Sequence, residues 1–139
     1  MSRVYNPDSA GKERNTLTRG IVVALRNLMK QQGTDDLTRD LAAYVALSLA
    51  EINDTIEASV SAWEKRGYWV KADKFRLDWE WTGTTSVALT SALLKDDWAT
   101  VALTSAKIAQ KLGSITVPEH NRLGTPWIGC WKKLKETNK

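Results

Sequence analysis

The chain has 139 residues, a length typical of one domain, and its 42% hydrophobic and 26% charged residues are typical of a folded globular protein. A single cysteine, Cys130, excludes an internal disulfide and a cysteine-based zinc site, and a single histidine, His120, excludes a two-histidine metal motif. The formal net charge of +4 is too mild to indicate nucleic-acid binding by itself.

The ends and the uncharged stretches of the chain bear on its location. Residues 1–15 are polar and lack the apolar core of a secretory signal. The longest uncharged stretch, residues 81–94, is shorter than the ~18 apolar residues that a membrane span needs. From these patterns we expect a cytoplasmic protein that makes no membrane contact.

The first part of the chain divides into a predicted arm and a predicted helix. Residues 1–14 contain Asn-Pro and Gly, which favour turns, and predict an extended arm. A helix is predicted to begin at Asn15 or Thr16, to follow helical apolar spacing and to end before Gly33. Gly20 inside this helix lowers its intrinsic stability, which indicates close packing against a neighbour.

The second predicted helix, residues 35–66, has the most regular pattern. Asp35 and Asp36 supply a capping oxygen and negative charge at its start, and Gly67 ends it. Apolar side chains recur every three or four residues and form one continuous stripe: Leu41, Val45, Leu49, Ile52, Ile56, Val60 and Trp63.

Two further helical regions follow. The region 68–93 continues the same spacing, but poor helix formers at 82–85 leave open a kink or a break near Gly83. A fourth helix is predicted from Asp96 and Asp97 to Gly113, with one face formed by Trp98, Val101, Ser105, Ile108 and Leu112.

A hexapeptide, VALTSA, occurs twice, at residues 87–92 and 101–106. The spacing of fourteen residues is close to four helical turns, so a continuous helix would present both copies on the same face. Duplication of a helical hairpin and chance similarity both remain open, because the composition is common in helices.

The C-terminal region, residues 113–139, is predicted to be an irregular tail with one short amphipathic helix. Thr125 and Pro126 suit the start of that helix, and Trp127 and Trp131 are expected to anchor it. The whole pattern predicts a single all-α domain over residues 1–139: an antiparallel bundle of about four helices with a short C-terminal amphipathic helix.

Charge alternates in blocks along the chain. Residues 34–64 carry seven acidic and one basic side chain, whereas residues 65–77 carry five basic and one acidic. Within the segment 64–81, basic side chains alternate with aromatic ones, and seven are candidate binding residues: Lys65, Arg66, Trp69, Lys71, Lys74, Arg76 and Trp81. Helical geometry separates Trp81 from Trp79 by about 200°, so these aromatics cannot all share one core face.

Two clusters of chemically active residues are weaker candidates. Glu51, Asp54 and Glu57 could bind a divalent cation on the long helix, but such a site requires carboxylates from a facing helix, and no second motif of this kind occurs. Cys130 and His120 lack an oxyanion hole or orienting group in the sequence. We therefore expect no catalytic residue and no cofactor.

Three functions compete on this pattern. The first is a non-enzymatic interaction protein that contacts a protein partner or a second copy of itself through residues 65–81 and the tail, because Trp is enriched at binding hot spots. The second is single-stranded nucleic-acid binding, in which basic groups neutralise phosphates and aromatic rings stack on bases. The third is a metal-dependent, all-α nucleotide hydrolase using Glu51, Asp54 and Glu57.

Overall fold

The computed structural model describes residues 7–138, which form six helices joined by turns and loops. The helices are α1 (Pro7–Met29), α2 (Asp36–Lys65), α3 (Trp69–Trp79), α4 (Trp81–Leu94), α5 (Trp98–Lys111) and α6 (Cys130–Thr137). No strand occurs in this part of the chain, so the all-α prediction is confirmed. None of the described helices is both long and apolar enough to cross a membrane.

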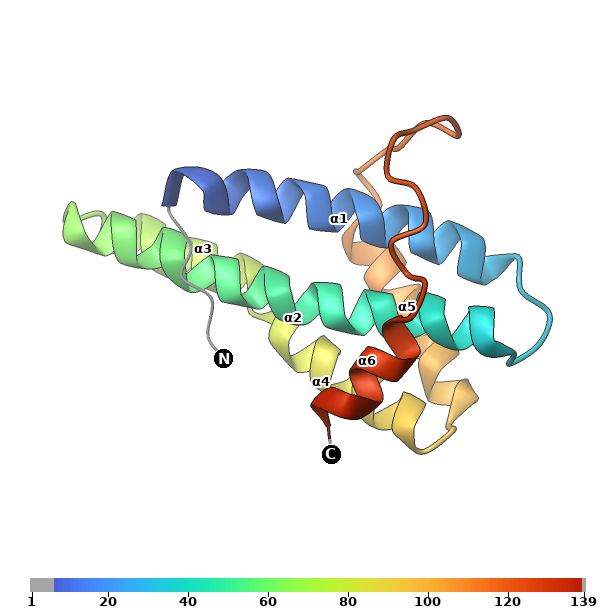
Figure 1. Ribbon diagram of the computed structural model, residues 1–139. Helices are drawn as coiled ribbons and strands as arrows, with labels where there is room; N and C mark the ends of the chain where they lie inside the picture. Colours follow the sequence, from blue (N-terminus) through green and yellow to red (C-terminus); the bar gives the residue numbers. More distant parts are fainter. Residues whose placement is uncertain (1–6, 139) are drawn as a thin grey trace.

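Helix α2 is the centre of the molecule. It packs against α1, α3, α4 and α6, while α5 packs mainly on α4. Figure 1 shows α1 and α2 side by side and antiparallel, with α3, α4 and α5 behind them. The predicted stripe of α2 forms much of the core, since six of its seven members are at most 2% exposed: Leu41, Val45, Leu49, Ile52, Ile56 and Val60.

The prediction of an extended arm is wrong for residues 7–14, because α1 begins at Pro7. Proline is favoured at the first helical position, where its missing N–H would have no intrahelical partner. The interpretation of Pro7 as a turn residue therefore placed the helix start about two turns too late. Residues 1–6 of the predicted arm lie outside the described residues.

The break in the third helical region falls at Glu80, three residues before Gly83. Glu80 keeps helical backbone angles (φ −62°, ψ −22°), so the chain bends there and does not form a loop. The hydroxyl of the buried Thr82 donates a hydrogen bond to the Trp79 carbonyl at 2.8 Å. Such bonds from Thr to a preceding carbonyl bend helices, which accounts for the junction of α3 and α4.

Helices α2 and α4 end in the same type of hydrogen-bonded turn. After α2, Gly67 (φ +79°) donates to the Glu64 carbonyl and Tyr68 donates to the Trp63 carbonyl. After α4, Asp96 (φ +58°) and Asp97 make the corresponding bonds to Leu93 and Ala92. Both are Schellman motifs, in which the left-handed position is usually Gly.

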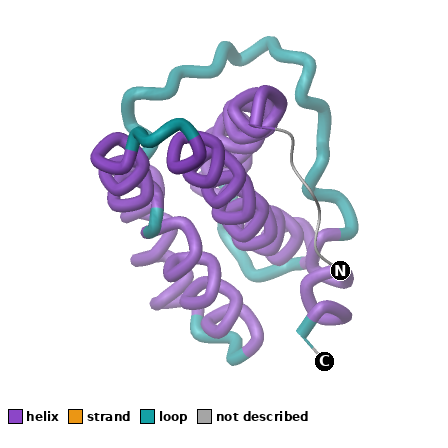
Figure 2. Tube along the Cα trace, turned by 90° about the vertical axis from the view of Figure 1, so that its left-hand side faces the viewer, coloured by secondary structure: helices purple, strands orange, loops and turns teal. Residues whose placement is uncertain are grey.

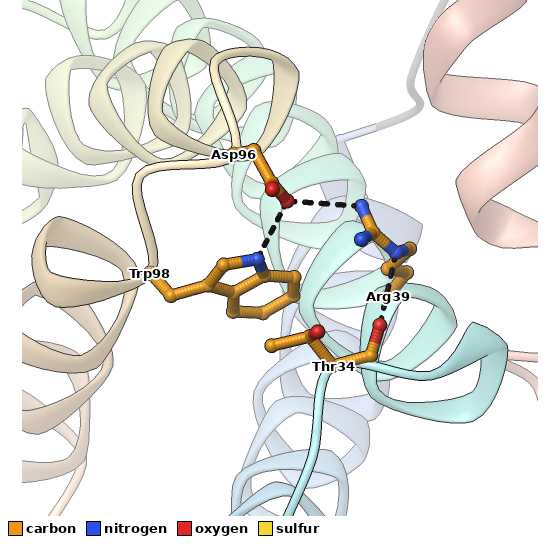
Figure 3. Close-up of polar contacts among 4 residues, drawn as sticks. All are labelled: Thr34, Arg39, Asp96 and Trp98. Atoms are coloured by element: carbon orange, nitrogen blue, oxygen red, sulfur yellow. Dashed lines mark hydrogen bonds and ion pairs between the residues drawn. The ribbon is translucent and has the colours of Figure 1, made fainter.

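The side chain of Asp96 takes part in a cluster at the junction of α2 and α5 (Figure 3). Its Oδ1 accepts a hydrogen bond from Trp98 Nε1 at 2.7 Å and lies 3.2 Å from Arg39 Nη1. Arg39 Nε donates to the Thr34 carbonyl at 3.1 Å, and its guanidinium lies over the rings of Trp98 and Trp131 at 5.4 and 5.7 Å. Trp98 is thus fixed at the edge of the core and is half-buried.

The tail crosses the bundle before it forms α6. Figure 2 shows the loop arching past α1, from α5 on one side to α6 on the other. Arg26 Nη2 donates to the carbonyl of the buried Val117 at 2.6 Å and ties the loop to α1. Helix α6 begins at Cys130, four residues after Pro126, because Gly129 (φ +84°) interrupts the predicted helix.

The two tryptophans of the tail differ in burial. Trp127 is 7% exposed and packs edge-on against Tyr44, with ring centroids 6.3 Å apart. Trp131 is half-buried, and its backbone N–H, with that of Gly129, donates to the carboxylate of Asp40. The prediction that these tryptophans anchor the tail is therefore confirmed, with the Asp40 carboxylate as an additional anchor.

The VALTSA copies occupy different environments in α4 and α5. Leu89 is fully buried, whereas its counterpart Leu103 is 67% exposed. Conversely, Val87 is 71% exposed and its counterpart Val101 is 3% exposed. The turn at Asp96 separates the two helices, so the copies do not repeat a packing unit.

Candidate binding surface at the turn between α2 and α3

The turn between α2 and α3 carries three exposed apolar side chains at one end of the molecule, on the left of Figure 1. Tyr68 is 54% exposed, Trp69 is 59% exposed and Val70 is 85% exposed. We call these three side chains the aromatic tip. The Schellman turn at Gly67 fixes the chain direction here, so the tip projects from a hydrogen-bonded base and not from an irregular loop.

Four basic side chains flank the aromatic tip in the sequence, at the end of α2 and in the first turns of α3, and we call them the basic rim: Lys65, Arg66, Lys71 and Lys74. All four are exposed. Among the described residues, Lys65, Arg66 and Lys74 form no ion pair. Lys71 Nζ lies 4.8 Å from the centre of the Trp63 ring, a cation–π contact at the inner edge of the rim. Three of the four rim side chains, Lys65, Arg66 and Lys74, therefore present positive charge that no acidic side chain among the described residues pairs with.

Two of the seven predicted binding residues lie away from the tip. Arg76 is within 3.8 Å of the carboxylates of Glu57 and Glu64 and within 3.5 Å of Asp73. Trp81 is half-buried at the start of α4, twelve positions and about 18 Å of helix from Trp69. The structure brings five of the predicted residues together and leaves Arg76 and Trp81 outside the surface.

The other aromatic residues of this segment form an inward-facing cluster. Phe75 packs edge-on against Trp63 with ring centroids 4.8 Å apart, and Trp79 lies 6.3 Å from Phe75. The guanidinium of Arg14 lies 4.8 Å from the Phe75 ring centre and donates to Thr55 Oγ1 at 3.0 Å. Burial in this cluster lowers the pKa of Arg14 from its ordinary value. These three rings are half-buried and pack against the core.

The acidic residues of α2 that could bind a cation, Glu51, Asp54 and Glu57, differ in their surroundings. No group of three or more His, Cys, Asp or Glu side chains that could hold a metal ion occurs in residues 7–138. Glu57 lies against Arg76, and Asp54 is exposed. The hydrolase hypothesis therefore lacks the facing carboxylates that it requires.

Cys130 is a poor nucleophile in this setting. Burial raises the pKa of its thiol, which keeps the thiol protonated near neutral pH. Its Sγ donates a hydrogen bond to the Pro126 carbonyl at 3.5 Å, in the turn that precedes α6. His120 is exposed in the loop before α6.

Comparisons with models of protein families, with curated proteins and with solved structures find no match to this chain. Sequence reasoning did not include Tyr68, Val70 or the 68% exposed Leu77 among the binding residues. The sequence did contain a signal for two of them, because Val70 and Leu77 lie seven residues apart on one helical face. In the structure both are exposed, and Ala72 is the one buried residue of α3.

Proposed function

We propose that this protein is a non-enzymatic interaction module whose aromatic tip binds an acidic segment of a partner protein that also carries large apolar side chains. The observation that carries the proposal is the exposure of Tyr68, Trp69 and Val70 within the basic rim. Exposed apolar patches with a polar border are typical of protein interaction sites, and Trp, Tyr and Arg are the commonest hot-spot residues.

The fold itself does not need these apolar side chains. Trp69 and Val70 are mostly exposed, and the apolar contacts of α3 with the core come from Ala72, Phe75 and Trp79. Burying the tip against a partner would remove apolar surface from water, which stabilises a complex by about 25 cal/mol per Å² before the costs of association.

The charge around the tip favours a different protein over a second copy of this chain. Residues 64–74 contain four basic and two acidic side chains. A symmetric dimer centred on the tip would place the two basic rims beside each other, and like charges in contact are unfavourable. An acidic partner instead gains attraction to Lys65, Arg66 and Lys74 and associates faster at low salt.

The experiment is a peptide-display selection on the wild-type protein. We expect enriched peptides to contain Asp or Glu beside one or two large apolar residues. Their binding should weaken in Trp69→Ala and in the double variant Lys65→Glu/Arg66→Glu. The matched control is Leu103→Ala, because Leu103 is 67% exposed but lies on α5.

The selection can also reject the proposal. Peptides without acidic bias, or peptides that bind Trp69→Ala as well as they bind the wild type, would contradict it. Salt-dependent binding of a single-stranded oligonucleotide through the same residues would support the nucleic-acid hypothesis instead. A mass above 15.5 kDa in light scattering that falls to 15.5 kDa in Trp69→Ala would indicate self-association.

A further inference from the structure

A second concave site lies between α1 and α5, away from the aromatic tip. Its volume is about 560 Å³, within the range of about 300–1,000 Å³ found for small-molecule sites. The C-terminal end of α1, the loop between α1 and α2 and one face of α5 enclose it. Helices α1 and α5 contact each other only sparsely, which leaves this space open.

The lining of the cavity is apolar on two sides and carries no charged side chain. Leu25, Leu28 and Met29 of α1 form one wall, and alanines of α5 form a smooth wall opposite: Ala102, Ala106 and Ala109. Polar but neutral groups lie at its end, among them Gln31 and Gln32. An ionised ligand would lose bound water on entering this site without gaining an ion pair, which is unfavourable, so the lining favours a neutral ligand.

One polar atom at this site has no partner. Ser105 lines the cavity, and its Oγ is buried without a hydrogen bond among the described residues. A buried hydroxyl without a partner is unfavourable, and nearly all such groups in proteins are satisfied. Rotation of the Ser105 side chain to another staggered rotamer would turn the hydroxyl toward the cavity, where a ligand with a hydrogen-bonding group can supply the missing partner, because a hydroxyl both donates and accepts.

Trp98 forms another part of the lining, and its ring is held in place before any ligand arrives. Its Nε1 donates to Asp96, and Arg39 lies over its ring, as Figure 3 shows. Asp96 occupies a left-handed position that disfavours non-glycine residues. A strained residue that fixes an aromatic wall is typical of pre-organised sites.

From these four observations we infer that the cavity between α1 and α5 binds a neutral, largely apolar ring compound that carries one hydrogen-bonding group for Ser105. The slot between the leucines and the alanines accepts a flat ring, the absence of charge selects a neutral molecule, and the hydroxyl sets its orientation. This site is independent of the aromatic tip, so either can fail without the other.

The test uses N-phenylnaphthylamine, a neutral fluorescent ring compound with one N–H group, and its sulfonated analogue, anilinonaphthalene sulfonate, which adds a negative charge to the same skeleton. We expect saturable fluorescence enhancement with the neutral probe. The sulfonated probe should bind at least about tenfold more weakly, because the cavity provides no cation for it.

Three variants and one control locate the binding. Ala106→Phe fills the slot and should abolish binding of the neutral probe, whereas Ala99→Phe, on the same helix but outside the lining, should not. Ser105→Ala should weaken binding about three- to tenfold, the effect of one hydrogen bond, without lowering the melting temperature, since the hydroxyl has no partner in the free protein. Asp96→Gly places glycine at the positive φ of the turn but removes the carboxylate that accepts the hydrogen bond of Trp98 Nε1. It should also weaken binding, because the Trp98 ring is then held less firmly.

Any of three results would overturn the inference: no saturable binding of the neutral probe, unchanged binding in Ala106→Phe, or equal binding of the sulfonated probe. A second copy of the chain would fill the groove instead if the neutral probe does not bind and the protein has a mass in solution of twice 15.5 kDa, which Ala106→Phe returns to 15.5 kDa.

Discussion

Gly20 and Tyr44 form the tightest contact between α1 and α2. A Cβ atom at position 20 would overlap the Tyr44 hydroxyl and lie 3.1 Å from its Cζ. The prediction that Gly20 marks close packing is confirmed, and the close neighbour is a side chain. At an exposed position inside a helix, Gly→Ala raises the free energy of unfolding by about 1 kcal/mol. At position 20 we expect the opposite sign, because the added Cβ would overlap Tyr44.

We predict that Gly20→Ala lowers the free energy of unfolding by about 1–2 kcal/mol, because the overlap outweighs the gain in helix propensity. The matched control is Gly11→Ala in the same helix, where the nearest atom, Arg14 Nη2, is 4.0 Å away. That control should raise stability by about 0.5–1 kcal/mol. Urea denaturation measures both, and a stabilised Gly20→Ala variant would contradict the packing account.

A second variant separates the hydroxyl from the ring. Tyr44→Phe removes the hydroxyl oxygen, the atom that a Cβ at position 20 would overlap most. The double variant Gly20→Ala/Tyr44→Phe should therefore lose less free energy of unfolding than the sum of the losses in the two single variants. Strictly additive effects would show that the two residues do not contact each other in solution.

Two aspartates give the helices α2 and α5 a pH dependence. Hydrogen bonds from the backbone and hydroxyl of Thr38 lower the pKa of Asp35, and those from the hydroxyl and backbone of Thr100 lower the pKa of Asp97. Since the folded pKa is depressed, the stabilisation is complete above the unfolded pKa of about 3.9 and is lost as the pH falls through the folded value.

We therefore predict that the melting temperature falls as the pH is lowered from about 5 to 3, and falls less in Asp35→Asn and Asp97→Asn, since Asn also caps a helix but does not titrate. Thermal melts recorded by circular dichroism across this range provide the measurement. An unchanged acid slope in the double variant would argue against these caps as a source of the pH dependence.

At the scale of elements, one carboxylate of α2 holds the start of α6 by two hydrogen bonds, in addition to the packing of the tail's tryptophans. Asp40 of α2 accepts hydrogen bonds from Trp131 N at 2.9 Å and Gly129 N at 3.2 Å. A carboxylate at the N-terminus of a helix also interacts favourably with the helix dipole. The first turns of α2 thus fix the position of the tail.

We predict that Asp40→Asn destabilises the protein by about 1–2 kcal/mol and that the loss is concentrated in α6. Hydrogen exchange should show reduced protection of α6 amides and unchanged protection in α1. Asp54→Asn is the control, because Asp54 is exposed on the same helix. Equal loss of protection throughout the bundle would show that Asp40 does not act on the tail specifically.

The elements also show what the sequence could predict. Helix α2 was predictable to one residue at each end, because its apolar stripe, its Asp35 cap and its terminal Gly67 all agree. The start of α1 was missed because Pro7 suits both a turn and a first helical turn. The bend at Glu80 depends on the hydrogen bond from the Thr82 hydroxyl to the Trp79 carbonyl. The turn before α6 ends at Gly129, which has a positive φ. The spacing of apolar residues predicts neither feature.

At the scale of the whole molecule, the candidate surface could be predicted in part. The sequence identified the basic and aromatic segment and showed that its tryptophans could not share one face. It could not separate Trp69 from Trp81, because that requires knowing that α3 ends in a bend and that Arg76 is held by acids from α2. Trp63 and Trp98, both predicted as core, are half-buried, since the large indole ring rarely fits fully inside.

The cavity between α1 and α5 lay outside sequence reasoning. Ser105 was recognised on the apolar face of its helix, but only the packing of α5 away from α1 shows that its hydroxyl has no partner. Concave sites depend on the distance between helices, which residue spacing along one helix does not determine.

The most direct test of the central claim is the affinity of an enriched acidic peptide for the wild type and for Trp69→Ala, measured by calorimetry at about 50 and 200 mM salt. The account predicts binding that weakens with salt and falls at least about tenfold in Trp69→Ala, with the melting temperature unchanged because Trp69 is 59% exposed. Equal affinity of the two proteins for the peptide would contradict it.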